Sequence, residues 1–287
     1  MTISIAEAIC EAAEVFHDAG LPEGRREAGG LLQHVLGRDR TFILAHPEQQ
    51  LSQAELQTFQ ELMKRRAAGE PLQYITAHQS FFGFDFEVAP GVLIPRPETE
   101  LLVELALEIL EGSQAPIICD VGTGSGCIAI TLLHERTDAQ AIAIDISAAA
   151  LEIAKRNAQR HSVETRLTFV RGNCFSSLSP AVSTFDLIVS NPPYVAEDAL
   201  DGLQREVRDH EPREALAGGP DGLDVVRRLL EESDAFLRPG GHLLIEIGFN
   251  QSAAVESLLQ GQTWIAKGIR HDLQGIPRVA VLQKTPF

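Results

Sequence analysis

The sequence predicts an α/β protein in which a helical N-terminal third precedes a doubly wound, mostly parallel β-sheet. Two patterns predict this fold. Residues 4–75 carry apolar residues at helical spacing, whereas strand-length apolar runs alternate with helical stretches from residue 117 onward. We therefore expect a helical bundle at 1–75, a β-hairpin linker at 76–97 and the sheet domain at 98–287.

The N-terminal third has the start and stop signals of a small helical bundle. Ser4 and Ser52 each stand where a helix N-cap is expected, and Glu55 completes a capping box with Ser52. Gly37 ends the second helix. The histidines of this part lack metal-ligand spacing. Because no catalytic constellation appears in it, we expect the bundle to recognise the substrate.

Apolar and polar residues alternate in the linker, as they do in a half-buried strand. Every second residue from Phe82 to Val88 is apolar, a Pro-Gly turn signal follows, and residues 92–94 are short and apolar. The pattern predicts a hairpin whose return strand is 92–94.

The first strand of the sheet, 117–121, runs directly into a glycine-rich turn. Glycines there let a ligand approach the backbone beside a helix N-terminus. The spacing is GxGxG, which departs from the GxGxxG of dinucleotide-binding folds. The candidate cofactor loop consists of Gly122, Thr123, Gly124, Ser125 and Gly126.

The next two strands also end in polar residues. The second strand, 141–145, ends in Asp145, where a carboxylate can accept hydrogen bonds from both hydroxyls of a ribose. The alternative is that Asp145 and Ser147 cap the helix that follows, and both interpretations stay open. After the third strand, 167–171, Asn173 and Cys174 fall where an adenine bound over the sheet edge would lie.

The fourth strand, 185–190, ends in the tetrapeptide Asn191, Pro192, Pro193 and Tyr194. Two prolines remove two backbone donors and stiffen the turn. The Asn191 amide oxygen and a free carbonyl would then form a receptor for a planar NH2 group, with Tyr194 as a flat face beside it. An ordinary strand-ending loop uses the same residue types, but the motifs upstream favour the functional interpretation.

The order of these motifs resembles that of the class I S-adenosylmethionine-dependent methyltransferases. The resemblance implies a seven-stranded, Rossmann-like sheet, S-adenosyl-L-methionine as cofactor, and Asn191 among the residues that contact it. The tetrapeptide resembles the subset that methylates amides or the exocyclic amines of bases. In that chemistry, the Asn191 side chain and the Pro192 carbonyl would accept the two N–H bonds of the target nitrogen during in-line methyl transfer.

Longer stretches resemble the release-factor glutamine methyltransferase (PrmC/HemK) family over nearly the whole chain. These stretches are 69–75, 82–83, 93–100, 211–216, 219–223 and 272–275 with Arg278. The resemblance implies a protein-(glutamine-N5) methyltransferase that modifies the glutamine of the Gly-Gly-Gln tip of class-1 peptide chain release factors. Members often have Asp and a large aromatic where this chain has Asn173 and Cys174, which weakens the expected adenine contact.

Three alternatives stay open. They are a glutamine methyltransferase of a ribosomal protein, a DNA adenine-N6 methyltransferase and a non-catalytic S-adenosylmethionine-binding adaptor. The formal net charge of −16 disfavours DNA, since a nucleic-acid binder normally presents a basic face. The intact tetrapeptide speaks against an adaptor, which would not need it.

The composition favours a cytoplasmic protein. No apolar run reaches the ~18 residues of a membrane span, and the N-terminus lacks the basic start and apolar core of a signal peptide. The four cysteines are scattered and are expected to be free thiols. We expect a monomer without a membrane, nucleic-acid or metal partner.

Overall fold

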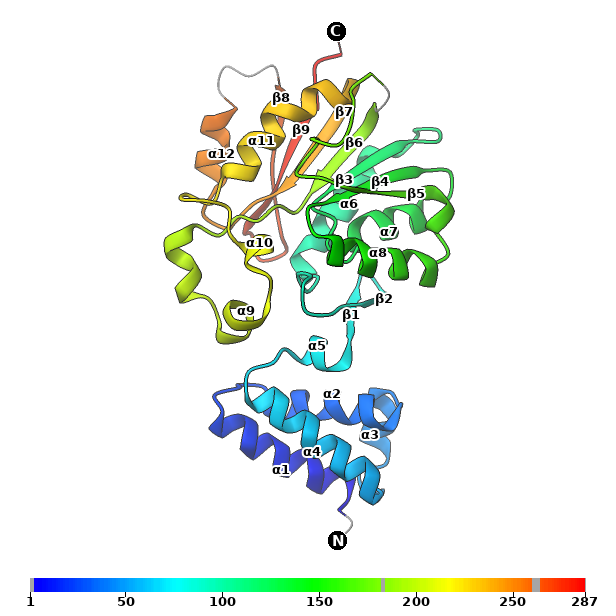
Figure 1. Cartoon of the computed structure of the whole chain (residues 1–287), viewed down its shortest axis with the longest axis vertical. Coiled ribbons are helices and arrows are strands. Elements are labelled where there is room, and N and C mark those ends of the chain that lie inside the picture. The colour runs from blue at the N-terminus through cyan, green and yellow to red at the C-terminus, as the bar shows by residue number, and fades with distance from the viewer. Residues whose placement is uncertain (1–2, 182–183, 260–263, 287) are drawn as a thin grey trace. The chain divides into compact units, whose positions relative to one another are not determined.

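The computed structural model describes residues 3–181, 184–259 and 264–286, which fall into two compact units (Figure 1). The first unit comprises Met1–His78 and Gln204–His210, and the second comprises Gln79–Leu203 and Glu211–Phe287. The chain therefore leaves the second unit once, adds a short helix to the first unit and then returns.

The first unit is a helical bundle around an apolar core. Its helices are α1 (Ile5–Asp18), α2 (Gly24–Leu36), α3 (Arg40–Ala45), α4 (Gln53–Ala67), α5 (Leu72–Thr76) and α9 (Arg205–His210). Ser4 and Ser52 cap α1 and α4 as predicted, each in a capping box, with Glu7 and Glu55 respectively. Gly37 ends α2 in the left-handed conformation, with φ of 59°.

Charged groups hold α9 in the first unit. The Arg66 side chain is 3% exposed, and its guanidinium lies 2.7 Å from both the Glu27 carboxylate of α2 and the Glu206 carboxylate of α9. Arg205 also donates to the Ala68 carbonyl at 2.7 Å. Removing the carboxylates would leave a buried cation without compensation. A polar segment therefore belongs to this unit although it adds little apolar surface.

A two-stranded hairpin, β1 (His78–Phe81) with β2 (Phe84–Glu87), follows the bundle. The expected return strand at 92–94 was wrong, because the chain turns earlier. Phe82 and Gly83 both have positive φ, 52° and 77°, which matches a two-residue turn whose twist suits a hairpin. The alternating phenylalanines therefore span the turn.

The second unit contains a seven-stranded, mostly parallel sheet, which confirms the predicted fold class. Its order is β5-β4-β3-β6-β7-β9-β8, in which the first five strands are parallel and β9 is antiparallel to both neighbours. The strands are β3 (Ile117–Val121), β4 (Gln140–Asp145), β5 (Leu167–Arg171), β6 (Phe185–Ser190), β7 (Leu237–Glu246), β8 (Trp264–His271) and β9 (Pro277–Lys284).

Helices cover both faces of the sheet (Figure 1). One face carries α6 (Glu100–Ile109), α7 (Cys127–Glu135) and α8 (Ala148–Arg160), and the other carries α11 (Asp224–Glu232) and α12 (Ser252–Leu258). Ile118 packs in the first of these cores and Cys119 in the second. Because both faces are buried, the central strands are continuous apolar runs. Shorter elements are α10 (Arg213–Leu216), η1 (Pro97–Thr99), η2 (Glu164–Arg166), η3 (Glu197–Gly202) and η4 (Ser233–Phe236).

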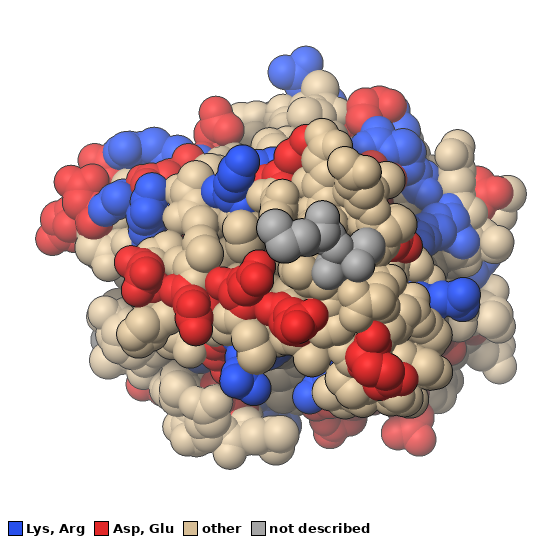
Figure 2. Space-filling view, turned by 90° about the horizontal axis from the view of Figure 1, so that it is seen from below, with Lys and Arg blue, Asp and Glu red and all other residues tan. Residues whose placement is uncertain are grey.

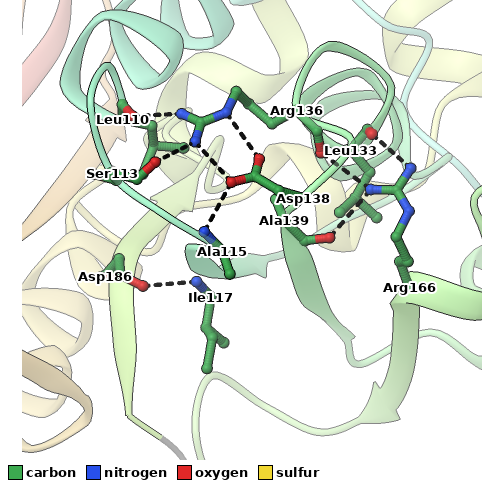
Figure 3. Close-up of polar contacts among 10 residues, drawn as sticks. All are labelled: Leu110, Ser113, Ala115, Ile117, Leu133, Arg136, Asp138, Ala139, Arg166 and Asp186. Atoms are coloured by element: carbon green, nitrogen blue, oxygen red, sulfur yellow. Dashed lines mark hydrogen bonds and ion pairs between the residues drawn. The ribbon is translucent and has the colours of Figure 1, made fainter.

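Two arginines form hydrogen bonds to backbone carbonyls near the amino ends of β3 and β4 (Figure 3). Arg136 donates to the carbonyls of Leu110 and Ser113 and pairs with Asp138. Arg166 donates to the carbonyls of Leu133, Arg136 and Ala139. Cations at carbonyl-rich helix ends satisfy acceptors that the helices leave unpaired. This edge lies opposite the carboxyl ends of the same strands, where the predicted site residues follow.

Candidate active site

The strand order reverses beside β3, which places the turns after β3 and β6 next to each other. β3 pairs with β4 on one side and with β6 on the other, and Val121 is the register partner of Ser190. Ligands of open parallel sheets bind outside the carboxyl ends of the strands at such a point. A cavity of about 490 Å³ opens there, which lies within the ~300–1,000 Å³ typical of small-molecule sites.

The cavity brings together most of the residues that the sequence singles out. Its lining includes Gly122, Gly124, Asp145, Asn173, Cys174, Asn191, Pro192 and Pro193. Four predicted residues are not part of this lining, namely Thr123, Ser125, Gly126 and Tyr194. The local structure of each turn decides which of the predicted residues face the cavity.

The turn after β3 folds back over β4. The backbone N–H groups of Gly122 and Thr123 both donate to the Ile144 carbonyl, at 2.8 and 3.0 Å. Gly122 and Gly124 have φ of 76° and 57°, a region that favours glycine. A Cβ added at Gly124 would meet no atom within 4 Å, so the backbone here is open to a ligand.

The other members of this turn support it from within. The Thr123 hydroxyl donates to the buried Asp120 carboxylate at 2.7 Å, and burial raises the pKa of Asp120 to about 7. The Ser125 carbonyl accepts from the Asn157 amide at 2.9 Å. A Cβ at Gly126 would come within 2.8 Å of an α7 side chain. These three residues therefore stabilise the turn from inside and do not line the cavity.

Asp145 lines the cavity and also braces two turns. Its Oδ2 accepts from the Gly124 N–H and its Oδ1 from the Ser147 N–H, both at 2.8 Å. The Ser147 hydroxyl accepts from the Ala150 N–H and caps α8. Burial raises the pKa of Asp145. Ser147 therefore takes the capping role, whereas Asp145 is both a brace and part of the cavity wall.

Asn173 and Cys174 form another part of the wall. Arg228 donates to the Asn173 side-chain oxygen at 2.6 Å and to its carbonyl at 3.2 Å. Cys174 is buried, with φ of 50°, and burial raises the pKa of its thiol. The Asn173 oxygen is thus engaged by an arginine, and the neighbouring thiol supplies apolar surface.

Asn191 carries an unsatisfied acceptor. Its Nδ2 donates to the Thr99 hydroxyl at 3.0 Å, while its Oδ1 is buried and has no hydrogen-bond partner among the described residues. Most buried polar atoms in proteins are paired. An unpaired amide oxygen in a cavity-lining residue therefore marks the place where an incoming N–H group would be stabilised.

The backbone after Asn191 is held by residues from later in the chain. The Tyr194 carbonyl accepts from the Gln251 side chain at 3.0 Å, and the Val195 N–H donates to the Leu216 carbonyl at 2.9 Å. Gly222 packs so closely that an added Cβ would lie 2.3 Å from the Tyr194 oxygen. Burial raises the pKa of Tyr194 to about 12, so its hydroxyl stays neutral.

Sequence reasoning missed the walls that come from outside the strand ends. Gly91–Leu93 and Pro212–Ala215 line the cavity. The buried Glu211 carboxylate accepts from the Ile94 N–H and the Arg96 guanidinium, which joins these two segments. Leu93 and Pro212–Ala215 belong to stretches that carry the family resemblance, but the hydrophobic pattern gave neither segment a role in the site.

The described residues show neither a metal cluster nor a membrane span. Within them, no three His, Cys, Asp or Glu side chains are grouped to hold a metal ion, and no helix is both long and apolar enough to cross a bilayer. On the face in Figure 2, acidic side chains form a row across the centre with basic ones scattered around it. Basic side chains gather toward the right edge and at the upper left of that face.

Comparisons with known proteins identify the family. Residues 7–76 match the model of the PrmC N-terminal domain, and residues 98–208 match the methyltransferase small domain. A release factor glutamine methyltransferase of Koribacter versatilis is 42% identical over 282 residues, which cover 98% of this chain and 99% of the relative. The chain belongs to the release factor glutamine methyltransferase family. A further member, from Nitratidesulfovibrio vulgaris, is 47% identical and covers 93% of this chain and 89% of its own length.

Solved structures agree with this family at the level of the fold. A methyltransferase from Pyrococcus furiosus has a TM-score of 0.52 at 17% identity, covering 78% of this chain and 98% of that one. A 16S rRNA methyltransferase from T. thermophilus, in complex with AdoMet and guanosine, has a TM-score of 0.52 at 19% identity and covers 72% and 49%. The sheet is thus the one that methyltransferases use.

Proposed function

We propose that this protein transfers a methyl group from S-adenosyl-L-methionine to the side-chain nitrogen of a glutamine, at the Gly-Gly-Gln tip of class-1 peptide chain release factors. The observation that carries the proposal is the buried, unpaired Oδ1 of Asn191 in the cavity wall. Family membership supports the substrate, since relatives over nearly the full length are named for this reaction. We also infer that the protein acts as a monomer in the cytoplasm, where release factors work.

The cavity fits the cofactor in chemistry and size. The Asp145 carboxylate uses one hydrogen bond on each oxygen, so each oxygen retains acceptor capacity for a ribose hydroxyl. The open backbone at Gly124 suits a ligand that lies against the chain. Asn173 and Cys174 would border the adenine. The bound cofactor supplies an electrophilic methyl group on a sulfonium centre.

Asn191 and Pro192 would orient the substrate amide. An amide nitrogen is a poor nucleophile because its lone pair is delocalised into the carbonyl. The Asn191 Oδ1 and the Pro192 carbonyl would each accept one of its two N–H bonds, which fixes the nitrogen on the line of transfer and offsets the positive charge that develops on it. In this geometry the new C–N bond would form as the C–S bond breaks, and the surplus proton would leave to solvent afterward.

The proline pair and Tyr194 keep this receptor in shape. Neither proline has an N–H group, so neither competes with the substrate for the acceptors. Tyr194 lies outside the cavity lining and would support the receptor from behind, since its carbonyl accepts from Gln251. No carboxylate or imidazole is required as a base, because the nitrogen loses its proton readily once it is methylated.

The test is radiolabelled methyl transfer with the full chain. Substrates are a purified release factor, its tip Gln→Ala variant, ribosomal proteins and duplex DNA. We expect label on the release factor alone, and none on the tip variant. Asn191→Ala should abolish turnover while cofactor affinity stays within a few-fold, with Asn250→Ala as the matched control, because Asn250 is exposed and lies outside the cavity lining. Label on DNA or on ribosomal proteins instead would refute the proposed substrate.

A further inference from the structure

Asn191 is linked through one hydroxyl to a buried carboxyl group. The Asn191 Nδ2 donates to Thr99 Oγ1 at 3.0 Å. Burial raises the pKa of the Glu246 carboxyl group, and hydrogen bonding with the Thr99 side chain opposes that rise. Thr99 is 2% exposed at the start of α6, and Glu246 is 1% exposed at the carboxyl end of β7. The three residues come from separate elements of the second unit and meet behind the cavity wall.

The donors and acceptors of this chain can be assigned in only one order when Glu246 is ionised. A carboxylate only accepts, so the single hydroxyl proton of Thr99 points to Glu246. The hydroxyl lone pairs are then left for Asn191, which must present its NH2 group to Thr99. The Asn191 amide oxygen consequently points the other way, toward the position where a substrate N–H would bind.

The opposite orientation of the amide would be inactive. It would place Oδ1 against the lone pairs of Thr99 and aim two N–H donors at the target NH2 group, which presents N–H donors of its own. Asparagine amides are nearly symmetric in shape, so packing alone distinguishes the two orientations poorly. Hydrogen bonding to Thr99 supplies the distinction.

Burying the Glu246 carboxyl group lowers the stability of the folded state, and apolar packing does not require a carboxyl group at this position. Its Oε2 is buried without a hydrogen-bond partner among the described residues, and burying a charge without full compensation costs stability. The charged or ionisable groups that influence it are Arg96, Glu98, Tyr194, Arg278 and Cys127. Unpaired buried groups of this kind call for a functional explanation.

We propose that Thr99 and Glu246 are positioning residues that set the polarity of the Asn191 amide and thereby select an NH2 group as the methyl acceptor. The inference rests on the proposed function, because it assigns a task to two residues behind the same site. Neither residue needs to touch the substrate. Both act through Asn191, so their effect belongs to the chemical step and not to cofactor binding.

The test compares Thr99→Val with Thr99→Ser in the full-length protein. Valine keeps the branched shape of threonine but lacks the hydroxyl group, whereas serine keeps the hydroxyl group. We expect Thr99→Val to lower kcat by about 10- to 100-fold, as removal of an orienting partner does, with cofactor affinity within about twofold. Thr99→Ser should restore most of kcat. Thr131→Val is the matched control, because the buried Thr131 hydroxyl on α7 has no partner in the described chain.

The outcomes separate this inference from the proposed function. Wild-type kcat in Thr99→Val, with Asn191→Ala inactive, would overturn the positioning role and leave the proposed function intact. A loss in Thr99→Val that includes cofactor binding, or that Thr99→Ser does not repair, would also overturn it by marking a merely structural role. Full activity of Asn191→Ala would overturn the proposed role of Asn191 and this inference together.

Discussion

Glu246→Gln should stabilise the protein at alkaline pH and leave its stability nearly unchanged at acid pH. Glu246 is fully buried, and burial raises its pKa from 4.5 to about 7. A carboxyl group whose pKa is higher in the folded state binds more protons there than in the unfolded chain. Its contribution therefore falls as pH rises from the unfolded pKa through the folded one. Glutamine has the same shape and no such penalty.

The size of the effect follows from the two pKa values. A rise from 4.5 to about 7 corresponds to about 3 kcal/mol of unfolding free energy at 1.36 kcal/mol per pH unit. The penalty is nearly absent at pH 4, grows between pH 4.5 and 7, and is fully present at pH 8. Asp120, whose burial raises its pKa to about 7 as well, contributes equally to both proteins, so its effect cancels in the difference.

The assay is urea denaturation of wild type and Glu246→Gln at pH 4, 6 and 8. We expect the difference in unfolding free energy to grow by about 3 kcal/mol in favour of the variant between the lowest and highest pH. Glu231→Gln is the control, because Glu231 is exposed and its substitution should leave the difference flat. A pH-independent difference, or a variant that is less stable at pH 8, would refute the burial penalty.

Three further changes test the supports of the site. Gly222→Ala should lower the unfolding free energy by about 1–2 kcal/mol from its φ of 77° alone. The added Cβ would also clash with the Tyr194 carbonyl oxygen, which should lower the rate of methyl transfer. Thermal melting and activity assays compare it with Gly202→Ala, where an added Cβ meets no atom within 4 Å. Asp145→Ala should weaken cofactor binding about 10- to 100-fold, as loss of a charged hydrogen-bond partner does; calorimetry that finds unchanged affinity would contradict the ribose contact. Arg136→Met should lower the unfolding free energy by about 1.5–3 kcal/mol, because the Leu110 and Ser113 carbonyls lose this donor. The melting temperature should fall while cofactor affinity stays constant. A loss of cofactor affinity would count against a purely structural role.

The sheet could be predicted because its strands are buried on both faces. β3, β5 and β6 occupy the residues predicted, and β4 begins one residue earlier. Continuous apolar runs that end in Gly, Asp or Asn leave little ambiguity, since helices need longer periodic stretches. The polar residues at the strand ends then had to meet at one edge of a parallel sheet, which is why eight of the twelve predicted site residues line the cavity.

Other features depend on contacts that a local pattern does not contain. The alternation from Phe82 to Val88 looks like one strand, and the positive φ of Phe82 is invisible in the sequence. Helix α9 belongs to the first unit because of the ion pair between Arg66 and Glu206, which lie far apart in the chain. Nothing in the sequence reveals that Thr99, which accepts from Asn191, is also the hydrogen-bonding neighbour of the buried Glu246.

The tetrapeptide alone is a weak predictor of chemistry, because residues far from it in the chain complete the site. Asn191 can be read from the sequence, but its usefulness depends on which end of its amide faces the substrate. That choice is made by Thr99, which precedes it by more than ninety residues, and by Glu246 behind Thr99. A chain with the tetrapeptide and an apolar residue at either position should bind the cofactor in the same fold and still transfer methyl groups slowly. Selectivity for an NH2 acceptor is therefore a property of three strand and helix ends together.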